Sequence, residues 1–119
     1  MAYVSMFAAA VPTAKKDEYV AMASKVDSWF RKQGATRVVD CWGADVPDGK
    51  LTSFPMAVKK EDDETVVVGW VEWPAKADAD AAFTAMQTAE EFSPDKTPMP
   101  FDGKRMIFGG FASVFEANA

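Results

Sequence analysis

The segment Met99–Arg105 contains a candidate site for binding an anion. Asp102, Lys104 and Arg105 lie close together in it, and an arginine guanidinium can hold a carboxylate or a phosphate through two hydrogen bonds. The same residues are also typical of a turn without a ligand, in which Asp102 closes the turn and Gly103 adopts a positive φ. A ligand site here would lie where the chain enters its last strand.

That last strand is expected to begin at Lys104. Strand side chains alternate between the two faces of a sheet, so Lys104 and Arg105 should point in opposite directions. Whichever of them points inward must meet a carboxylate or a ligand, because a buried unpaired cation is unfavourable. Arg105 is the predicted anion-binding group, and an internal ion pair with Glu72 or Asp40 is the alternative.

Asp45, Lys50 and Ser53 form a second polar group, in a turn-rich segment that follows the second expected strand. Binding residues are common on loops at strand ends, because the rigid sheet positions them. These residues are therefore a second candidate ligand site, with ordinary turn chemistry as the alternative interpretation.

Cys41 and Trp42, at the end of that strand, add a thiol and an aromatic ring. The thiol could act as a nucleophile or a redox sensor, but no neighbour in the sequence would activate it. We predict instead that Cys41 is a small buried hydrophobic residue. Trp42, together with Trp70 and Trp73, could line a pocket for a flat organic molecule, or could belong to the core or to a dimer contact.

The composition excludes several classes of chemistry. The chain has no histidine and one cysteine, so it lacks Ser–His and Cys–His nucleophile pairs, an intrachain disulfide and a cysteine-rich metal cluster. The acidic run Glu61–Glu64 lacks the spacing of a calcium loop. No metal and no cofactor are predicted.

The charge argues against nucleic acid as a partner. A net charge of −5 repels a phosphate backbone, and the basic residues occur only in short groups. The run Gly110–Phe115 faintly resembles the aromatic signature of RNA-recognition domains, but the basic-Gly-aromatic opening is absent. No apolar run is long enough to cross a bilayer. The N-terminus has no basic residue before Lys15, so it does not resemble a signal peptide. We therefore expect a cytoplasmic protein without a membrane partner.

Hydrophobic periodicity predicts the elements that must position these residues. The 119 residues, of which 49% are hydrophobic, fit one domain over residues 1–119 with a substantial core. Runs rich in β-branched and aromatic residues predict strands, and apolar residues at helical spacing predict helices. The predicted elements are strands at Tyr3–Val11, Thr36–Gly43, Thr65–Trp73 and Lys104–Glu116, helices at Lys15–Gln33 and Ala75–Glu91, and a short extended piece at Phe54–Lys59.

Single residues indicate how these elements begin, end and bend. Thr13 is a candidate N-cap for the first helix, and Gly34 is placed to end it in a left-handed conformation. Gly109 and Gly110 suggest a bulge in the last strand. Asp27 is assigned to the polar face of the first helix.

The order of elements predicts an α+β fold. Two split βαβ halves give a ferredoxin-like βαββαβ sandwich, an antiparallel sheet with both helices on one face. The first, third and fourth strands are apolar on both faces. In the third, Val66, Val68 and Trp70 lie on one face and Val67, Val71 and Trp73 on the other. A sheet that is apolar on both sides needs cover on both sides, and a second copy is the simplest cover. We therefore predict a homodimer in the form of a dimeric α/β barrel.

Three stretches of the sequence resemble one known family. They are Cys41–Lys59, Asp63–Val67 and Met99–Phe111, the last containing Met-Pro-Phe-Asp-Gly-Lys-Arg-Met-Ile. Together they resemble the bacterial YbaA-like family of uncharacterised proteins, over nearly the whole chain, although Trp42 and Ala44 depart from its pattern. The resemblance implies the dimeric α/β-barrel form of the ferredoxin-like fold. It implies no activity and no catalytic residues.

The sequence leaves the function open between two classes. The first is a small-molecule-binding dimeric α/β-barrel protein, with a pocket between sheet and helices. By analogy of fold, a cofactor-free enzyme of the monooxygenase or isomerase type belongs to the same class. The second is a non-catalytic protein-interaction module. A pocket with convergent polar groups would favour the first class, and a packed interior with an exposed apolar patch the second.

Overall fold

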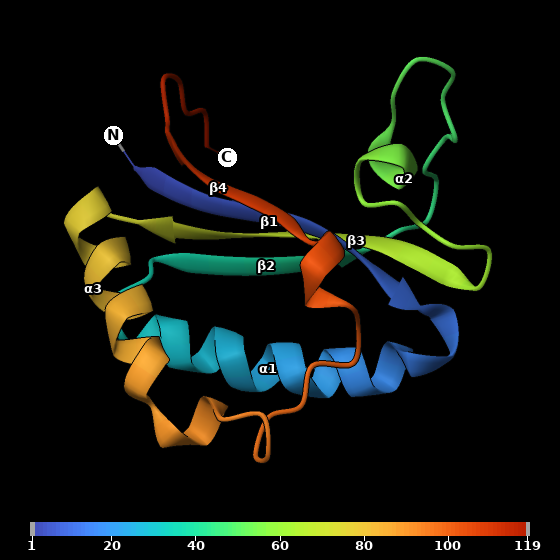
Figure 1. Ribbon diagram of the computed structural model, residues 1–119. Coiled ribbons are helices and arrows are strands. Elements are labelled where there is room, and N and C mark those ends of the chain that lie inside the picture. The colour runs from blue at the N-terminus through green and yellow to red at the C-terminus, as the bar shows by residue number, and fades with distance from the viewer. Residues whose placement is uncertain (1, 119) are drawn as a thin grey trace.

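The computed structural model describes residues 2–118, which contain four strands and three α-helices (Figure 1). Along the chain these are β1 (Tyr3–Pro12), α1 (Lys16–Lys32), β2 (Arg37–Trp42), α2 (Phe54–Ala57), β3 (Glu64–Trp73), α3 (Lys76–Thr88) and β4 (Ile107–Ala112). Short 3-10 turns occupy Thr13–Lys15, Glu90–Phe92 and Gly103–Arg105.

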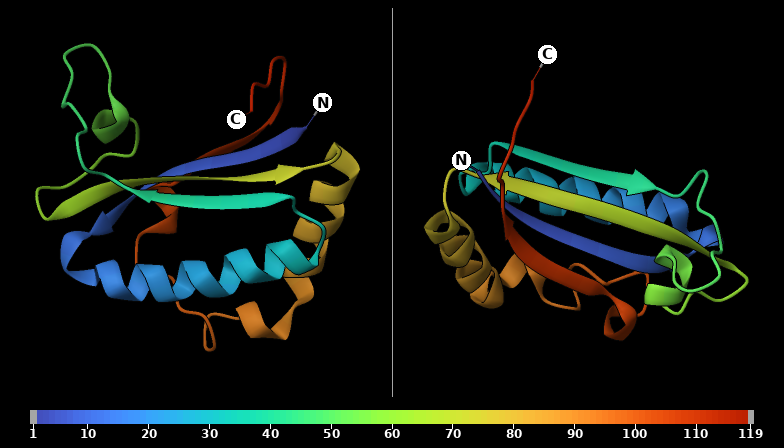
Figure 2. Two further views of the ribbon diagram at one scale, coloured as in Figure 1. Left: turned by 180° about the vertical axis from the view of Figure 1, so that it is seen from behind. Right: turned by 90° about the horizontal axis from the view of Figure 1, so that it is seen from above.

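The strands form one antiparallel sheet in the order β2-β3-β1-β4. The helices α1 and α3 lie on one side of this sheet, and α2 and the C-terminal segment lie on the other (Figures 1 and 2). Two split βαβ units produce this arrangement. The predicted α+β ferredoxin-like fold is confirmed.

Helix α1 lies against the sheet through an apolar stripe. Tyr19, Ala23 and Phe30 recur at helical spacing and are buried. After the helix, Gly34 adopts a φ of +107°, a conformation that residues with a side chain rarely adopt. The predicted glycine stop is therefore confirmed.

The predicted N-cap of this helix is wrong. Thr13 lies in a 3-10 turn that precedes the helix, and the helix begins at Lys16 without a side-chain cap. The Thr13 hydroxyl lies 2.7 Å from the Thr65 hydroxyl on β3 and hydrogen bonds with it. Thr13 therefore ties the end of β1 to the neighbouring strand.

The core between α3 and the sheet is built around Trp73. This side chain is fully buried, and its ring meets that of Phe30 edge to face with centroids 5.7 Å apart. Ala79 and Ala82, both buried in the same cluster, present small side chains on the buried side of α3. The indole Nε1 of Trp73 donates to Ser5 Oγ at 3.3 Å.

The sheet face opposite α1 and α3, here called the outer face, is covered at one end only. There Val46 and Val58 pack against Ala8, Ala10 and Val66. From the strand register and the alternation of side chains, the apolar residues of the outer face are Val4, Met6, Ala8, Ala10, Val39, Cys41, Val66, Val68, Trp70, Ile107 and Phe111, and the charged residues Arg37, Glu64 and Glu72 lie on the same face. Away from the covered end this apolar surface is open.

The segment predicted as an extended piece contains the helix α2 instead. The Ser53 hydroxyl accepts a hydrogen bond from the Met56 backbone N–H at 3.1 Å, which is the interaction of a helix N-cap. Pro55 lies at the start of this helix, where its missing N–H is harmless. Local capping therefore outweighs the extended pattern of residues 54–59.

The last strand is shorter than predicted. Lys104 and Arg105 lie in the 3-10 turn Gly103–Arg105, and β4 starts at Ile107. The Asp102 side chain accepts from the Lys104 backbone N–H at 2.9 Å and caps the turn. Lys104 and Arg105 therefore do not alternate between the two faces of the sheet as strand residues would.

The two predictions for glycines in this region are also wrong. Gly103 is not among the residues of 2–118 with positive φ, since the capped turn supplies the bend. Gly109 and Gly110 pair in regular register with Met6 and Ser5, so β4 has no bulge there. A side chain at Gly110 would collide with the Tyr3 hydroxyl and would require the Tyr3 ring to move.

Candidate functional site

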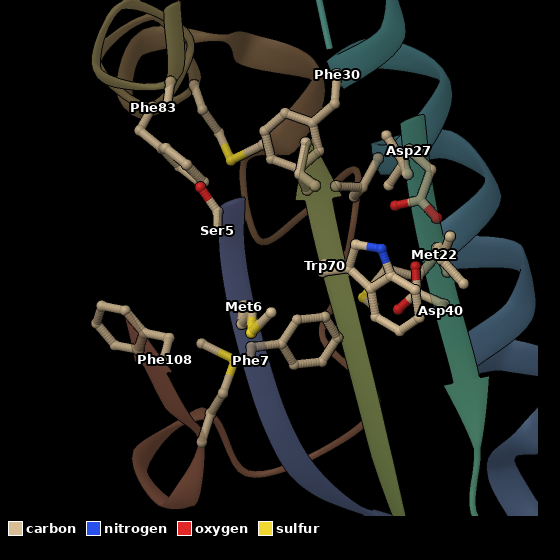
Figure 3. A pocket seen from close by; sticks show the side chains of 18 of the residues that line it. Ser5, Met6, Phe7, Met22, Asp27, Phe30, Asp40, Trp70, Phe83 and Phe108 are labelled. Atoms are coloured by element: carbon tan, nitrogen blue, oxygen red, sulfur yellow. The ribbon is translucent and has the colours of Figure 1, made fainter. Parts of the chain in front are cut away.

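A cavity of about 680 Å³ lies between the sheet and the helices α1 and α3 (Figure 3). Ligand pockets in proteins span about 300–1,000 Å³, so this volume suits a small organic molecule. All four strands and both helices contribute to its lining, and the segment between α3 and β4 adds Phe92, Thr97, Met99, Phe101 and Met106.

Aromatic and methionine side chains form most of the cavity wall. Phe30 and Phe83 lie together at the end near α3, and Phe7 and Phe108 lie along β1 and β4 (Figure 3). Phe83 is 39% exposed and Phe108 is 78% exposed, although both are large apolar residues. Large apolar side chains that are exposed in this way are typical of binding surfaces.

Two carboxyl groups lie on the opposite wall of the cavity from Phe83 and Phe108. Asp27 comes from α1 and Asp40 from β2, and they are within hydrogen-bonding reach of each other (Figure 3). Burial, the hydrogen bond with Asp40 and the charge of Asp40 raise the pKa of the Asp27 carboxyl to about 8. At neutral pH Asp27 is therefore largely protonated and hydrogen bonds with Asp40; the two residues are called here the carboxyl pair.

Tyr19 on α1 supports the carboxyl pair. Its hydroxyl donates to Asp40 Oδ1 at 2.6 Å. Burial, followed by this hydrogen bond, raises the pKa of the Tyr19 phenol above its usual value, so the phenol remains a donor. Ring contacts with Trp42 and Phe101, at centroid distances of 6.0 Å and 6.1 Å, hold the phenol in place.

Sequence reasoning missed the carboxyl pair, although one signal was present. Asp27 follows Ala23 by four residues and precedes Phe30 by three, which places it on the buried stripe of α1 rather than on the polar face. Asp40 alternates with Val38 and Trp42, which face the helices. That these two faces meet is a property of the tertiary structure.

Arg105, the predicted anion-binding group, forms an internal ion pair. Its two terminal nitrogens donate to the two carboxylate oxygens of Glu64, both at 2.7 Å. Its Nε donates to Asp102 at 3.1 Å, and Nη1 also donates to the Lys59 carbonyl oxygen at 2.8 Å. Of the two alternatives for Arg105, the structure therefore shows the internal ion pair, but its partner is Glu64 and not Glu72 or Asp40.

The predicted burial of Cys41 is wrong. Cys41 is exposed on the outer face, because β2 is an edge strand and only Val68 of β3 lies beside it in register. Trp42 faces the helices, packs on Tyr19 and has the Lys16 ammonium 5.5 Å from its ring centroid.

The remaining predicted site residues are spread over the surface. Lys104 is exposed beside Asp102, Asp45 is exposed in the loop after β2, and Ser53 caps α2. In the described chain, none of the seven predicted residues (Cys41, Trp42, Asp45, Ser53, Asp102, Lys104 and Arg105) belongs to the cavity lining. These residues do not come together at one site, so ligand binding by them stays a prediction.

No group of three or more His, Cys, Asp or Glu side chains in residues 2–118 is arranged to hold a metal ion. Within the same range, each helix is too short or too polar to cross a bilayer.

Comparison with known proteins gives the relatives of this chain. Residues 2–103 match the family model described as a protein of unknown function (DUF1428). The uncharacterized protein YbaA of Escherichia coli K12 is 50% identical over 116 residues, which cover 98% of this chain and 99% of that protein. A YbaA protein of Shigella flexneri matches to the same extent.

Among solved structures, a dimeric ferredoxin-like protein from an uncultured marine organism is similar in fold. It superposes with a TM-score of 0.63 at 10% sequence identity and covers 98% of both chains. Similarity at this identity concerns the fold alone.

Proposed function

We propose that this chain, which belongs to the DUF1428 family of proteins of unknown function, is a homodimer that binds a small, largely apolar organic molecule. The binding site is the cavity between the sheet and the helices α1 and α3. The single observation that carries this proposal is a cavity of ligand size in which apolar walls surround a few convergent polar groups.

The character of the lining supports a ligand rather than empty space. Phe30, Phe83 and Met86 face the cavity from the helices, and the carboxyl pair with Tyr19 supplies polar groups on one side only. An apolar body would remove the aromatic walls from water, and a polar end would meet the carboxyl pair. These features favour small-molecule binding over a protein-interaction module with a packed interior.

Filling the cavity tests this proposal. We expect wild-type protein to bind the neutral probe naphthalen-1-ylmethanol, and Val26→Trp to weaken that binding at least about tenfold, because the larger ring occupies the cavity. Val20→Trp is the matched control, since Val20 lies on the same helix and is 51% exposed outside the lining. Calorimetric titration measures the affinities. Absence of probe binding by wild type, or equal binding by both variants, would contradict the proposal.

The open part of the outer face supports the homodimer. Met6, Ile107 and Phe111 on this face are 44%, 45% and 53% exposed, although they are large and apolar. A monomer rarely leaves such a continuous apolar surface in water. The solved ferredoxin-like protein with the similar fold is described as dimeric. A second copy of this chain, packed face to face on the outer face, would bury these residues.

Sedimentation of charge variants tests the homodimer. At micromolar concentration the wild-type protein should sediment with twice the mass of the chain. Phe111→Asp should sediment as a monomer, because a buried unpaired carboxylate at the interface is strongly unfavourable. Val20→Asp makes the same kind of change on the opposite side, on α1, and should leave the dimer intact. A monomeric wild type, or a dimeric Phe111→Asp, would refute this interface.

A further inference from the structure

We infer that the ligand of the cavity is an organic amine, bound as a cation with its nitrogen between Asp27 and Asp40 and its apolar body against the aromatic walls. This inference rests on the proposed function, and it names the class of molecule that the same cavity accepts.

The charges of the cavity favour a cation. The described lining residues include three carboxyl groups, those of Asp27, Asp40 and Asp80, and the phenols of two tyrosines. They include no Lys and no Arg. Asp80 already pairs with the Lys76 ammonium at 2.6 Å. The carboxyl pair therefore remains as the polar end of the cavity, and it would repel a carboxylate or a phosphate.

The carboxyl pair offers acceptors that match an ammonium group. Asp40 Oδ1 accepts the Tyr19 hydroxyl, and Asp40 also hydrogen bonds with Asp27. An ammonium has three donors and no acceptor, so it can replace the proton of Asp27 and hydrogen bond to both carboxylates. The faces of aromatic walls such as Phe30 also attract cations.

An inorganic cation fits the same site less well. Calcium takes six to eight oxygen ligands, and magnesium retains several waters, as a general rule. The carboxyl pair supplies two residues, and most of the surrounding lining is hydrocarbon. The apolar walls match the carbon skeleton of an organic amine, which would displace water from them.

The groups that face Asp27 predict how binding depends on pH. They are Asp40 from β2 and Tyr19 from α1, and Asp80 is the charged lining residue on α3. Below the Asp27 pKa of about 8, a bound ammonium must displace the proton of Asp27. The affinity for an amine should therefore fall about tenfold for each pH unit below that pKa, with release of a proton.

Three probes with the same ring system separate the alternatives. Calorimetric titration compares naphthalen-1-ylmethylamine, naphthalen-1-ylmethanol and 1-naphthoic acid at about pH 8.5 and about pH 6. At the higher pH the amine should bind at least about tenfold more tightly than the alcohol, because it forms charge-assisted hydrogen bonds. The acid should bind more weakly than the alcohol, and only the amine should lose affinity at the lower pH.

A charge variant assigns the effect to the carboxyl pair. Asp27→Asn should reduce the affinity for the amine about tenfold at the higher pH and remove its pH dependence. Far-UV circular dichroism and thermal unfolding check that the variant is folded. Asp17→Asn makes the same change at an exposed position of α1 and should bind the amine like wild type.

The outcomes separate this inference from the proposed function. If the alcohol binds and the amine binds no better, the amine class is refuted while the cavity remains a binding site. Tighter binding of the acid would also refute it. If none of the three probes binds, both proposals fail.

Discussion

Replacing Arg105 by alanine is expected to lower the melting temperature by about 10 °C. Arg105 holds both carboxylate oxygens of Glu64, and Glu64 is only 6% exposed. Without the guanidinium, Glu64 would be left as a buried carboxylate whose remaining hydrogen bond comes from the Glu61 backbone N–H. Removal of one partner of a buried ion pair is strongly destabilising for this reason. Thermal unfolding at neutral pH measures the loss.

The pH dependence of stability gives a second readout for the same variant. Hydrogen bonding to Arg105 is the main cause that lowers the pKa of Glu64 below its ordinary value of 4.5. The pair therefore stabilises the fold above about pH 4.5, and this contribution is lost as the pH falls through the lowered pKa. Arg105→Ala should show less of this acid-dependent loss than wild type.

Lys104→Ala is the matched control for Arg105→Ala. Lys104 is the neighbouring basic residue in the same 3-10 turn, and its side chain is exposed. This variant should melt within a few degrees of wild type, because exposed charges contribute little to stability. Equal melting temperatures for the two variants would show that the pair with Glu64 is not structural.

Replacing Trp73 by alanine is expected to lower the free energy of unfolding by about 3–5 kcal/mol. Trp73 is fully buried between the sheet and α3, and its ring contacts Phe30 and Phe83 edge to face. The substitution removes a large apolar surface and leaves a void that the neighbouring rings can fill only in part. Denaturant unfolding at neutral pH measures the difference.

Two controls separate the causes of this loss. Ser5→Ala removes only the acceptor of the Trp73 indole N–H and should lower the free energy of unfolding by about 1 kcal/mol. Trp42→Ala makes the same truncation at a half-buried position on an edge strand and should be less destabilising than Trp73→Ala. If Trp42→Ala were the more destabilising of the two, this account of the core would be wrong.

Local sequence was a good guide to the elements and a poorer guide to their ends. The stripe of Tyr19, Ala23 and Phe30 predicted α1, and Gly34 predicted where it stops. The start of β4 was predicted too early, because the capped turn that contains Arg105 looks extended when its hydrogen bonds are unknown. Helix α2 was missed for the same reason, since its cap is a single side-chain contact.

Side-chain environment was harder to predict than secondary structure. Cys41 was expected to be buried because its strand is apolar, yet an edge strand on an uncovered face leaves it exposed. Trp70 and Trp73 differ by three residues and lie on opposite faces of β3, one on the outer face and one in the core. Which face is covered depends on where the helices lie, and strand pattern alone does not specify this.

By itself, the sequence determined the order of strands and helices, the α+β ferredoxin-like fold, the absence of histidine chemistry and the second apolar face of the sheet. The tertiary structure decided which polar residues meet. Asp27 and Asp40 face one cavity because α1 packs against β2, and Arg105 reaches Glu64 across 41 residues of chain. Periodicity fixes the face on which a residue lies, because it reflects local geometry. It does not fix which faces come together, because long-range packing determines the partner of each buried charge.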